Sequence, residues 1–352
     1  MATLIFTGGG TAGHCTPCLA LLPYVKNDFD KIYYIGSENG IERGIVEKTG
    51  IPYYGVPCAK LARSFTLKNF SIPFKVFSGI KKAGKILDEL SPDVVFSKGG
   101  YVSLPVVIAA KKRGIPVVAH ESDYTAGLAN KLAAGYCKKV LTAFPETAAN
   151  VKNGEYAGAP IRRELFTANK TAALKSFGFT DGKPVLLVTG GSQGAQALNE
   201  ALRAALPDLL PRFNVIHLCG KNNLSGMIKQ KGYFETEFLS RVEDAFVCAD
   251  VCVSRAGSNS VFELLALNIP CVLVPLPKGN SRGDQVLNAE YFQKLGLCAV
   301  LPQNVLTKDS LLFAIDSVYA DRKNISRRFL AHPVKDASRK IAAVIADYKP
   351  LK

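Results

Sequence analysis

The fold is decided by Leu4-Ile5-Phe6-Thr7-Gly8-Gly9-Gly10-Thr11-Ala12-Gly13-His14, an apolar strand that runs into a glycine-rich turn and the start of a helical pattern. The same order returns in Val185-Leu186-Leu187-Val188-Thr189-Gly190-Gly191-Ser192-Gln193-Gly194-Ala195. In Rossmann-like folds this order brings a phosphate close to the backbone N–H groups at a helix N-terminus. Two copies in one chain therefore predict two Rossmann-like domains.

Outside these two stretches, short apolar runs rich in Val, Ile and Leu alternate with longer helical patterns. This alternation is typical of parallel sheets that are covered by helices. We expect strands at residues 3–7, 31–35, 94–96, 117–120 and 140–143, and at 185–189, 215–218, 251–254 and 271–274. The sequence therefore predicts the α/β class, with a parallel sheet in each half.

The length of 352 residues exceeds what one hydrophobic core usually supports, which also favours two domains. Pro160, a charged stretch and Asp181-Gly182 interrupt the strand and helix pattern near the middle of the chain. We therefore expect an N-terminal domain over 1–160 and a C-terminal domain over 161–335. An amphipathic helix is expected within 336–352, where it can cover either domain and so join the N-terminal one.

The charge of the chain restricts its partners. A formal net charge of +15 and an isoelectric point near 9.3 imply a negatively charged partner, which is nucleic acid, an anionic membrane surface or a phosphorylated substrate. The sequence has neither an aromatic-basic RNA-binding pattern nor zinc-finger spacing. We therefore expect no nucleic-acid partner.

Hydropathy and cysteine usage indicate the compartment. The sequence has no apolar run of the roughly 18 residues that a membrane span requires, and its first residues lack the basic region of a signal peptide. The nine cysteines mostly stand alone in apolar surroundings, as small buried side chains do in a reducing compartment. We therefore expect a cytoplasmic protein.

The segment from Lys60 to Leu87 is basic, contains no acidic residue and is interleaved with aromatic side chains. Six of its residues share one predicted helical face, namely Val76, Phe77, Ile80, Ala83, Gly84 and Leu87. Two interpretations are open. The segment is either a surface that meets anionic lipid or an ordinary core-facing helix with a solvated basic face.

Gly8, Gly10 and Gly13 fit the G-x-G-x-x-G turn, in which the missing side chains admit a phosphate. A dinucleotide would also require an acidic residue roughly 20 positions further on to bind a ribose. Glu38 is an imperfect candidate for that position. A Rossmann oxidoreductase is therefore an alternative function.

His14 follows the first turn, at the sheet edge where α/β ligand sites form. A neutral imidazole there can take a proton from a hydroxyl, because its pKa is near neutrality and a helix N-terminus disfavours protonation. The alternative is a histidine that only makes local hydrogen bonds. Cys15 and Cys18 form a C-x-x-C, for which core packing is favoured over redox or metal chemistry.

In the second turn, Ser192 and the neighbouring N–H groups suit the diphosphate of a nucleotide sugar, although Ser192 can also be a helix N-cap. Residues 254–263 form another strand, turn and helix start. Near its end, the Glu263 carboxylate can bind two ribose hydroxyls or complement the helix dipole. Asp284-Gln285 and Asn288 are expected on a loop at the same sheet edge, where they either bind a ligand or are solvated.

Taken together, six motifs resemble those of the MurG family. These bacterial glycosyltransferases add N-acetylglucosamine to undecaprenyl-pyrophosphoryl-N-acetylmuramoyl-pentapeptide (lipid I) and so make the peptidoglycan precursor lipid II. The motifs are Gly8 to His14, Ser97 to Ser103, His120 to Asp123 with Gly127 to Lys131, Gly158 to Arg162, Gly190 to Ala195, and Ser254 to Glu263. The resemblance covers essentially the whole chain.

The resemblance implies a GT-B fold, in which two Rossmann-like parallel-sheet domains face each other across a cleft. It implies an inverting transfer from UDP-N-acetylglucosamine to the 4-hydroxyl of the N-acetylmuramoyl group, with no metal and no organic cofactor. The N-terminal domain would bind the acceptor and an anionic membrane surface, and the C-terminal domain would bind the donor. The protein would be peripheral, at the cytoplasmic face of the cell membrane.

By the same resemblance, His14 is the catalytic base. The substrate-binding residues would be Thr11, Ala12, Gly13, Tyr101, Asp123, Asn130, Arg162, Ser192, Gln193, Leu239, Ser258, Asn259, Glu263, Asp284 and Gln285. Glu263 would hold the ribose, the turn around Ser192 the phosphates, and the backbone near Leu239 the uracil. The lipid acceptor would lie near Gly99-Gly100-Tyr101.

The sequence departs from the commoner family pattern at two of these positions. Asp123 stands where many members have Asn, so its sugar contact would come from a carboxylate, and Asp284-Gln285 replaces what is often a Gln pair. Three alternative functions stand beside the one that the resemblance implies. They are another GT-B enzyme such as a glycolipid synthase or a UDP-sugar epimerase, a Rossmann oxidoreductase, and a non-catalytic protein that binds nucleotide sugars.

Overall fold

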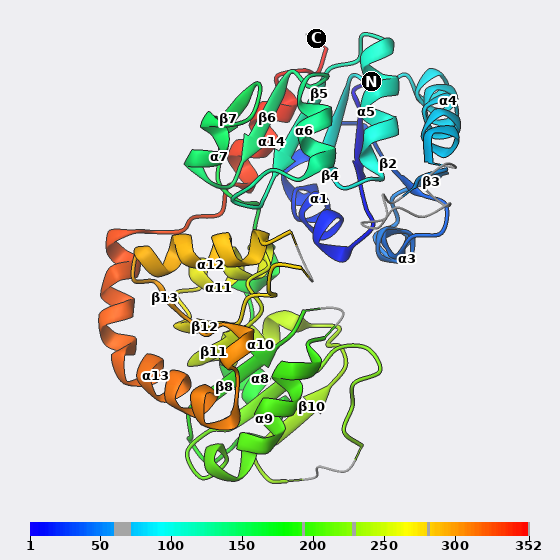
Figure 1. Ribbon diagram of the computed structural model, residues 1–352. Coiled ribbons are helices and arrows are strands. Elements are labelled where there is room, and N and C mark those ends of the chain that lie inside the picture. The colour runs from blue at the N-terminus through cyan, green and yellow to red at the C-terminus, as the bar shows by residue number, and fades with distance from the viewer. Residues whose placement is uncertain (60–71, 192–193, 227–229, 280–281, 351–352) are drawn as a thin grey trace. The chain divides into compact units, whose positions relative to one another are not determined.

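The computed structural model describes residues 1–59, 72–191, 194–226, 230–279 and 282–350, and the chain divides into two compact units (Figure 1). The first unit comprises Met1–Ile161 together with Asp336–Lys352, and the second comprises Arg162–Lys335. Each unit is built around one parallel sheet. The predicted α/β class, with two Rossmann-like parallel-sheet domains, is confirmed.

Sheet A, in the first unit, has seven strands in the order β3-β2-β1-β4-β5-β6-β7. They are β1 (Thr3–Gly8), β2 (Lys31–Ser37), β3 (Tyr53–Val56), β4 (Val94–Gly99), β5 (Val117–Glu121), β6 (Lys139–Thr142) and β7 (Gly154–Tyr156). The strand order reverses between β1 and β4. In α/β proteins, ligands bind at the carboxyl ends of the strands at such a switch point.

The central strands of sheet A are buried on both faces, because their side chains alternate between two apolar cores. Leu4 and Phe6 of β1 enter one core, and Ile5 between them enters the other. In β4, Val94 enters the same core as Leu4 and Phe6, and Val95 enters the same core as Ile5. Burial on both faces explains why these strands read as continuous apolar runs.

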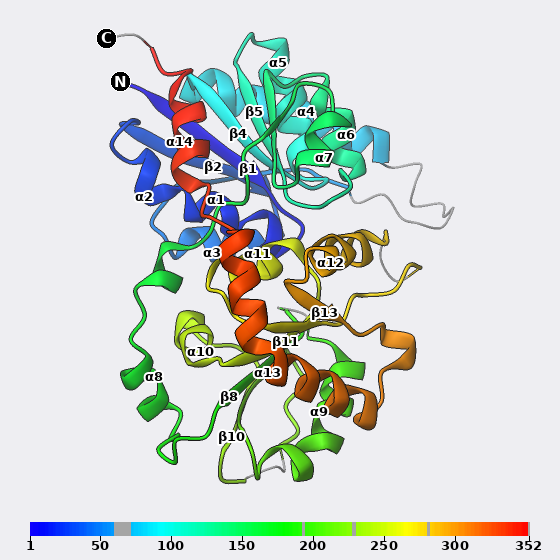
Figure 2. The ribbon, with the colours of Figure 1, turned by 90° about the vertical axis from the view of Figure 1, so that its left-hand side faces the viewer.

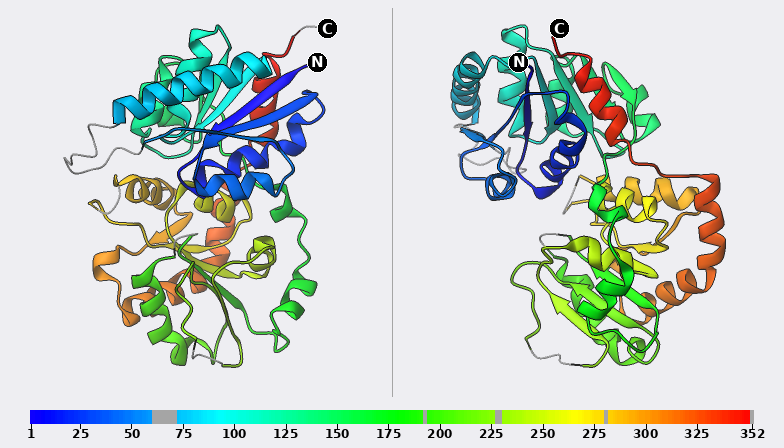
Figure 3. Two further views of the ribbon diagram at one scale, coloured as in Figure 1. Left: turned by 90° about the vertical axis from the view of Figure 1, so that its right-hand side faces the viewer. Right: turned by 180° about the vertical axis from the view of Figure 1, so that it is seen from behind.

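Helices cover both faces of sheet A. The face that contains Ile5 is covered by α4 (Ile72–Leu90), α5 (Ser103–Lys112) and α6 (Leu128–Ala134). The opposite face is covered by α1 (Thr16–Ala20), α2 (Leu22–Val25) and α14 (Ser338–Ala346), and Figure 3 shows α4 and α14 on opposite sides of the sheet. The unit also contains η1 (Ala12–His14), α3 (Ile41–Glu47) and α7 (Pro145–Ala149).

The C-terminal helix α14 belongs to the first unit, although it follows the second unit in the chain. Ile341 and Ile345 of α14 lie in the core beside α1 and α2 (Figure 2). Asp336, just before the helix, accepts hydrogen bonds from the Ile161 N–H at 2.9 Å and from the Tyr24 hydroxyl at 3.1 Å. The end of the chain is thus fastened to the first unit by both apolar packing and hydrogen bonds.

Sheet B, in the second unit, has six strands in the order β10-β9-β8-β11-β12-β13, and its order reverses between β8 and β11. The strands are β8 (Val185–Thr189), β9 (Asn214–Leu218), β10 (Tyr233–Thr236), β11 (Val251–Ser254), β12 (Cys271–Leu273) and β13 (Cys298–Val300). The helices are η3 (Arg163–Phe166), α8 (Lys170–Ser176), α9 (Gln196–Leu209), α10 (Val242–Cys248), α11 (Ser258–Ala266), α12 (Asp284–Lys294), η4 (Gln303–Val305) and α13 (Lys308–Ala331).

Four strands, β3, β7, β10 and β13, were not expected from the sequence. They are the two edges of sheet A and the two edges of sheet B. An edge strand has a neighbour on one side only, and most side chains of these four strands are partly exposed. They therefore lack the continuous apolar runs by which the central strands were recognised.

Candidate active site

Four of the predicted site residues of the first unit lie at one edge of sheet A. His14 follows β1, Tyr101 follows β4, and Asp123 and Asn130 follow β5. The three strands are neighbours in the sheet, so their carboxyl ends lie side by side. This edge includes the switch point between β1 and β4, where an α/β fold places its ligand.

The first glycine turn packs directly against His14 and Tyr101. A Cβ atom on Gly8 would lie 2.5 Å from the His14 carbonyl oxygen. Gly10 has a left-handed backbone with φ of 86°, and a Cβ there would lie 2.4 Å from Cε1 of Tyr101. On Gly100, a Cβ would lie 3.0 Å from Cδ2 of the His14 ring. The glycines are therefore needed for close packing inside the protein.

His14 ends the short helix η1, and its N–H donates to the Thr11 carbonyl at 3.1 Å. The next helix, α1, has only five residues, so the helix-end field that we expected to disfavour protonation is weak. His14 and Ala12 are half-buried, while Thr11 and Gly13 are exposed, which leaves the turn accessible to a ligand. The role of His14 as a base stays a prediction.

Cys15 and Cys18 are buried in the apolar core beside α1. Burial raises the pKa of Cys15 to about 11 and raises the pKa of Cys18 further. This is the opposite of the lowered pKa that a reactive thiol at a helix start would have. Both cysteines therefore fit the packing interpretation.

Glu121, which was not among the predicted site residues, holds the connection that carries Asp123 and Asn130. Its carboxylate accepts hydrogen bonds from the N–H of Asp123 at 3.0 Å, from the N–H of Gly127 at 2.9 Å and from Nδ2 of Asn130 at 2.8 Å. Asn130 Oδ1 is buried without a hydrogen-bond partner among the described residues. Glu121 could have been identified from the sequence, because it lies within the His120 to Asp123 motif.

A second group of buried polar side chains lies behind this edge. Nζ of the fully buried Lys98 lies 2.9 Å from Nδ1 of His120 and also contacts the Ser122 hydroxyl, while Nε2 of His120 lies 2.8 Å from the Gly158 carbonyl oxygen. Burial lowers the pKa of Lys98, and burial together with the charge of Lys98 lowers that of His120. A neutral His120 therefore accepts a hydrogen bond from Lys98 and donates one to the Gly158 carbonyl, which ties β4 and β5 to the segment after β7.

In the second unit, Glu263 is held by Arg162 through two hydrogen bonds. Arg162 Nε donates to Oε1 and Nη2 donates to Oε2, each at 2.7 Å. Glu263 lies in the second turn of α11, and its side chain is 12% exposed. Each carboxylate oxygen has a further lone pair, so Glu263 can still accept hydrogen bonds from hydroxyl groups.

Ser258 begins α11 at the carboxyl end of β11, next to the switch point of sheet B. Its hydroxyl oxygen is buried and has no hydrogen-bond partner within the part of the chain that the structure describes. A buried hydroxyl at a helix N-terminus is suited to an anionic ligand oxygen. The neighbouring Asn259 is half-buried.

Asp284 and Gln285 are the first residues of α12, and Asn288 lies one turn further along it. The expectation that they lie on a loop is therefore wrong. The helix starts earlier than its Gly- and Pro-rich flank suggested, because Gly283 takes a left-handed backbone with φ of 83° as N-cap. Gln285 Oε1 accepts from the Leu276 N–H at 2.9 Å, so this side chain fixes the segment after β12.

Three predicted donor residues remain, namely Ser192, Gln193 and Leu239. Ser192 and Gln193 lie outside the described residues, between Gly191 and Gly194. Leu239 is half-buried in the segment after β10. Arg255, at the end of β11, was not predicted; its guanidinium donates to the Val274 carbonyl at 3.0 Å and to Gln303 Oε1 at 2.5 Å. It brings a positive charge to the carboxyl edge of sheet B.

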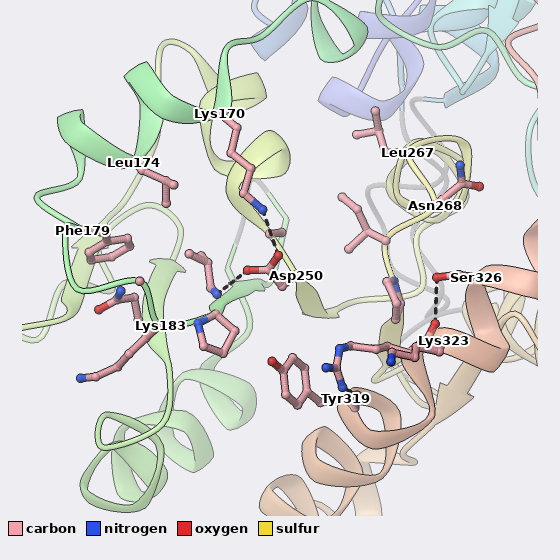
Figure 4. A pocket seen from close by; sticks show the side chains of 18 residues that line it. Lys170, Leu174, Phe179, Lys183, Asp250, Leu267, Asn268, Tyr319, Lys323 and Ser326 are labelled. Atoms are coloured by element: carbon pink, nitrogen blue, oxygen red, sulfur yellow. Dashed lines mark hydrogen bonds and ion pairs between the residues drawn. The ribbon is translucent and has the colours of Figure 1, made fainter.

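A cavity of about 660 Å³ lies at the other edge of sheet B, among the amino ends of its strands (Figure 4). Lys170 and Lys183 line the cavity, but both form ion pairs. Lys170 pairs with Asp250 at 2.9 Å, and Lys183 pairs with Asp181 at 3.2 Å. The second oxygen of Asp250 accepts from the Val185 N–H at 2.8 Å. The lining contains none of the predicted site residues, so the candidate site is the carboxyl edge and not this cavity.

The chain is similar to known glycosyltransferases in both of its units. Residues 4–142 match the glycosyltransferase family 28 N-terminal domain, and residues 185–342 match the glycosyltransferase family 28 C-terminal domain. Relatives from Clostridium botulinum (strain Langeland) and Lachnoclostridium phytofermentans are each 47% identical to this chain. The matches cover 97% and 99% of this chain, respectively, and 99% of each relative. Both are named UDP-N-acetylglucosamine--N-acetylmuramyl-(pentapeptide) pyrophosphoryl-undecaprenol N-acetylglucosamine transferase, the MurG enzymes. The chain belongs to the MurG family.

Solved structures of other glycosyltransferases share the fold of this MurG-family chain. The crystal structure of MurG from Acinetobacter baumannii has a TM-score of 0.76 at 24% identity, and the match covers 99% of this chain and 100% of that one. A glycosyltransferase of kitacinnamycin has a TM-score of 0.73 at 16% identity, with 99% of each chain covered. The predicted GT-B fold is confirmed.

Proposed function

We propose that this MurG-family chain transfers N-acetylglucosamine from UDP-N-acetylglucosamine to lipid I and so forms lipid II for peptidoglycan. The observation that carries the proposal is the 47% identity, over 97% of this chain, to a relative that is named for this transfer. The carboxyl edges of the two sheets support it, because each has a glycine turn at its switch point with polar side chains gathered around it.

The second unit is proposed to bind the donor. The Glu263 carboxylate, oriented by Arg162, would accept hydrogen bonds from the two ribose hydroxyls. The Ser258 hydroxyl, the Ser192-Gln193 turn and the charge of Arg255 would bind the diphosphate, because backbone N–H groups and cations both stabilise phosphate charge. Backbone groups near Leu239 would bind the uracil. The buried Ser258 hydroxyl, which has no partner among the described residues, supports this assignment.

Further donor contacts are proposed for the residues around these. Asn259, Asp284 and Gln285 would bind the N-acetylglucosamine and its phosphates, and Gln285 also fixes the segment after β12 through its bond to the Leu276 N–H. Thr11, Ala12 and Gly13 of the first unit would border the donor sugar. The exposure of Thr11 and Gly13 supports a ligand contact there.

The first unit is proposed to bind the acceptor and to begin the reaction. His14 would take the proton of the acceptor 4-hydroxyl as that oxygen attacks the anomeric carbon from the face opposite UDP. The new glycosidic bond forms as the bond to the diphosphate oxygen breaks, so the anomeric configuration inverts. UDP leaves with the electron pair, and the second glycine turn stabilises the phosphate charge that develops. Tyr101, Asp123 and Asn130 would hold the acceptor.

The protein is proposed to work at the cytoplasmic face of the cell membrane, as a peripheral protein that meets an anionic lipid surface. Every helix among the described residues is too short or too polar to cross a bilayer. Phe74 and Phe77 of α4 are 79% and 69% exposed, and Leu128 and Leu132 of α6 on the same side of sheet A are 56% and 50% exposed. Apolar side chains of this size on a basic surface suit an interface with lipid.

The two interpretations of the basic segment are each supported by a different part of it. Ala83 and Leu87 of α4 lie in the core, as the core-facing interpretation requires. Phe77, which we expected on that same face, is exposed instead, and this supports the lipid interpretation for the start of the helix. The earlier residues of the segment, 60–71, lie outside the described residues.

Calorimetric titration combined with a turnover assay tests the function. We expect the protein to bind UDP-N-acetylglucosamine more tightly than other UDP-sugars, to show no affinity for NADH, and to release UDP only when lipid I is present. Binding of NADH would support an oxidoreductase. Conversion of the sugar without lipid I would indicate an epimerase, and binding without any turnover would indicate a non-catalytic protein.

A further inference from the structure

A buried carboxylate lies directly beneath the first glycine turn. It belongs to Glu42, the second residue of α3, whose side chain has no exposure to solvent. Within the described part of the chain, the Glu42 oxygens accept three hydrogen bonds. Oε1 accepts from the Ser37 N–H at 3.0 Å and from the Ser37 hydroxyl at 2.5 Å, and Oε2 accepts from the Gly10 N–H at 3.2 Å. The carboxylate therefore joins the end of β2 to the turn.

The backbone around Glu42 leaves room for its carboxylate only because two neighbours are glycines. A Cβ atom on Gly9 would lie 2.5 Å from Oε1, and a Cβ on Gly40 would lie 2.3 Å from the same oxygen. Both distances are too short for any real contact. The space beside Gly9 is thus filled by a side chain of the protein itself.

The turn that Glu42 holds packs closely against the segment that carries His14 and against Tyr101. A Cβ on Gly100 would lie 2.4 Å from the Gly9 carbonyl oxygen and 3.0 Å from the His14 ring, and the ring of Tyr101 packs against Gly10. Burial, with a smaller contribution from the Glu42 charge, raises the pKa of Tyr101, which agrees with their proximity. A shift of Gly9 or Gly10 must therefore be passed on to His14 and Tyr101.

We propose that Glu42 is a positioning residue for sugar transfer. By holding the Gly10 N–H, it fixes the first glycine turn between His14 and Tyr101, so that both side chains keep their places relative to the acceptor hydroxyl. The inference rests on the proposed function. It concerns only the first unit, so the binding of the donor to the second unit serves as an internal reference.

Glu42→Gln is the sharpest variant. Glu42 acts only as an acceptor in its three hydrogen bonds. Two of the three donors are backbone N–H groups, which cannot act as acceptors in turn. The amide of a glutamine offers one oxygen, so its NH₂ must face an N–H group, either that of Gly10 or that of Ser37. The turn then loses its anchor or the end of β2 does, although the side chain keeps its size.

The matched control is Glu47→Gln on the same helix. Glu47 also carries a carboxylate, but its side chain is 51% exposed and pairs with Arg43 at the surface. We expect this variant to keep the kcat of the wild type. Glu42→Gln should lower kcat by on the order of 10²-fold, the cost of a misplaced catalytic group, with KM for the donor and the affinity for UDP unchanged. Glu42→Asp should show an intermediate loss.

The outcomes separate the two proposals. Absence of transfer by the wild-type protein would overturn the proposed function. Transfer by the wild type together with a kcat of Glu42→Gln within about twofold of it would overturn the positioning role. If Glu42→Gln fails to fold or loses UDP binding, Glu42→Asp decides, because it keeps the carboxylate but shortens the side chain by one methylene group and so draws the carboxylate away from the Gly10 N–H. A reduced kcat at constant donor KM then supports the proposal, and an unchanged kcat contradicts it.

Discussion

Arg162 and Glu263 form a two-point ion pair within the second unit, although 101 residues separate them in the chain. Arg162 is the first residue of the unit, and Glu263 faces it from α11. A planar guanidinium matches both carboxylate oxygens at once, so the pair fixes the rotation of the carboxylate as well as its position. The proposed ribose ligand is therefore oriented before the donor arrives.

Arg162→Lys should weaken the binding of UDP by about tenfold, because a lysine ammonium makes one contact where the guanidinium makes two and leaves Glu263 free to turn. Arg241→Lys is the control, because Arg241 also pairs with a carboxylate, Asp244, but is 66% exposed. Isothermal titration with UDP measures both variants. Equal affinity of Arg162→Lys and the wild type would show that Glu263 needs no orientation by Arg162.

His14→Ala should lower turnover by on the order of 10²-fold or more, because a general base contributes at least that much to deprotonation of a hydroxyl. His14 belongs to the first unit, so the affinity for UDP should change little. Steady-state kinetics with lipid I, together with UDP titration, measure the two quantities. Full turnover by the variant would remove His14 from the mechanism.

Changing both Phe74 and Phe77 to Ser should lower binding to vesicles that contain phosphatidylglycerol by at least about tenfold, because each exposed phenylalanine would lose its transfer into the interface. Phe313→Ser in α13 is the control, because Phe313 is 75% exposed but lies in the second unit. Vesicle sedimentation measures binding. If the double variant sediments like the control, the lipid surface lies elsewhere.

The second unit should lose stability as the pH falls below about 6.5. His217 is buried between Asn199 and Tyr233, with its ring nitrogens 2.9 Å from Asn199 Oδ1 and 2.8 Å from the Tyr233 hydroxyl. Burial lowers the pKa of His217 to about 4. The unfolded chain therefore binds a proton at a higher pH than the folded chain does, so stability decreases between about pH 6.5 and pH 4 and this contribution then levels off.

His217→Gln should flatten that decrease. We expect the Tm of the wild type to fall by about 5 °C more than that of the variant between about pH 7.5 and pH 5. The carboxyl of Glu235 does not interfere in this range. Burial raises its pKa, but hydrogen bonds from Ser225 and Arg203 outweigh burial and lower the pKa to about 2. Parallel Tm curves for the two proteins would show that His217 is not the group that titrates.

The sequence predicted the central strands of both sheets, because each is buried on two faces and so carries a continuous apolar run. It did not predict the edge strands, such as Tyr233–Thr236, in which all four side chains are partly exposed. It also placed Asp284 and Gln285 on a loop, because the left-handed N-cap at Gly283 looks like a turn residue when only the sequence is known.

Two of the site residues that were missed, Glu42 and Glu121, hold other parts of the site in place by hydrogen bonds. Glu42 bonds to Gly10, which is 32 positions away in the sequence. Glu121 bonds to three groups within its own connection, but only the folded loop brings them together. Such residues can be predicted when glycine positions are read as spaces for a side chain as well as for a ligand.

The most direct measurement of the central claim is the structure of the product. The protein would be incubated with radiolabelled UDP-N-acetylglucosamine and lipid I in anionic vesicles, and the labelled lipid isolated for NMR. We predict that the label appears on the 4-oxygen of the N-acetylmuramoyl group in the β configuration, opposite to that of the donor. Label that stays in the nucleotide sugar, or that reaches the lipid with the donor's configuration retained, would contradict the account.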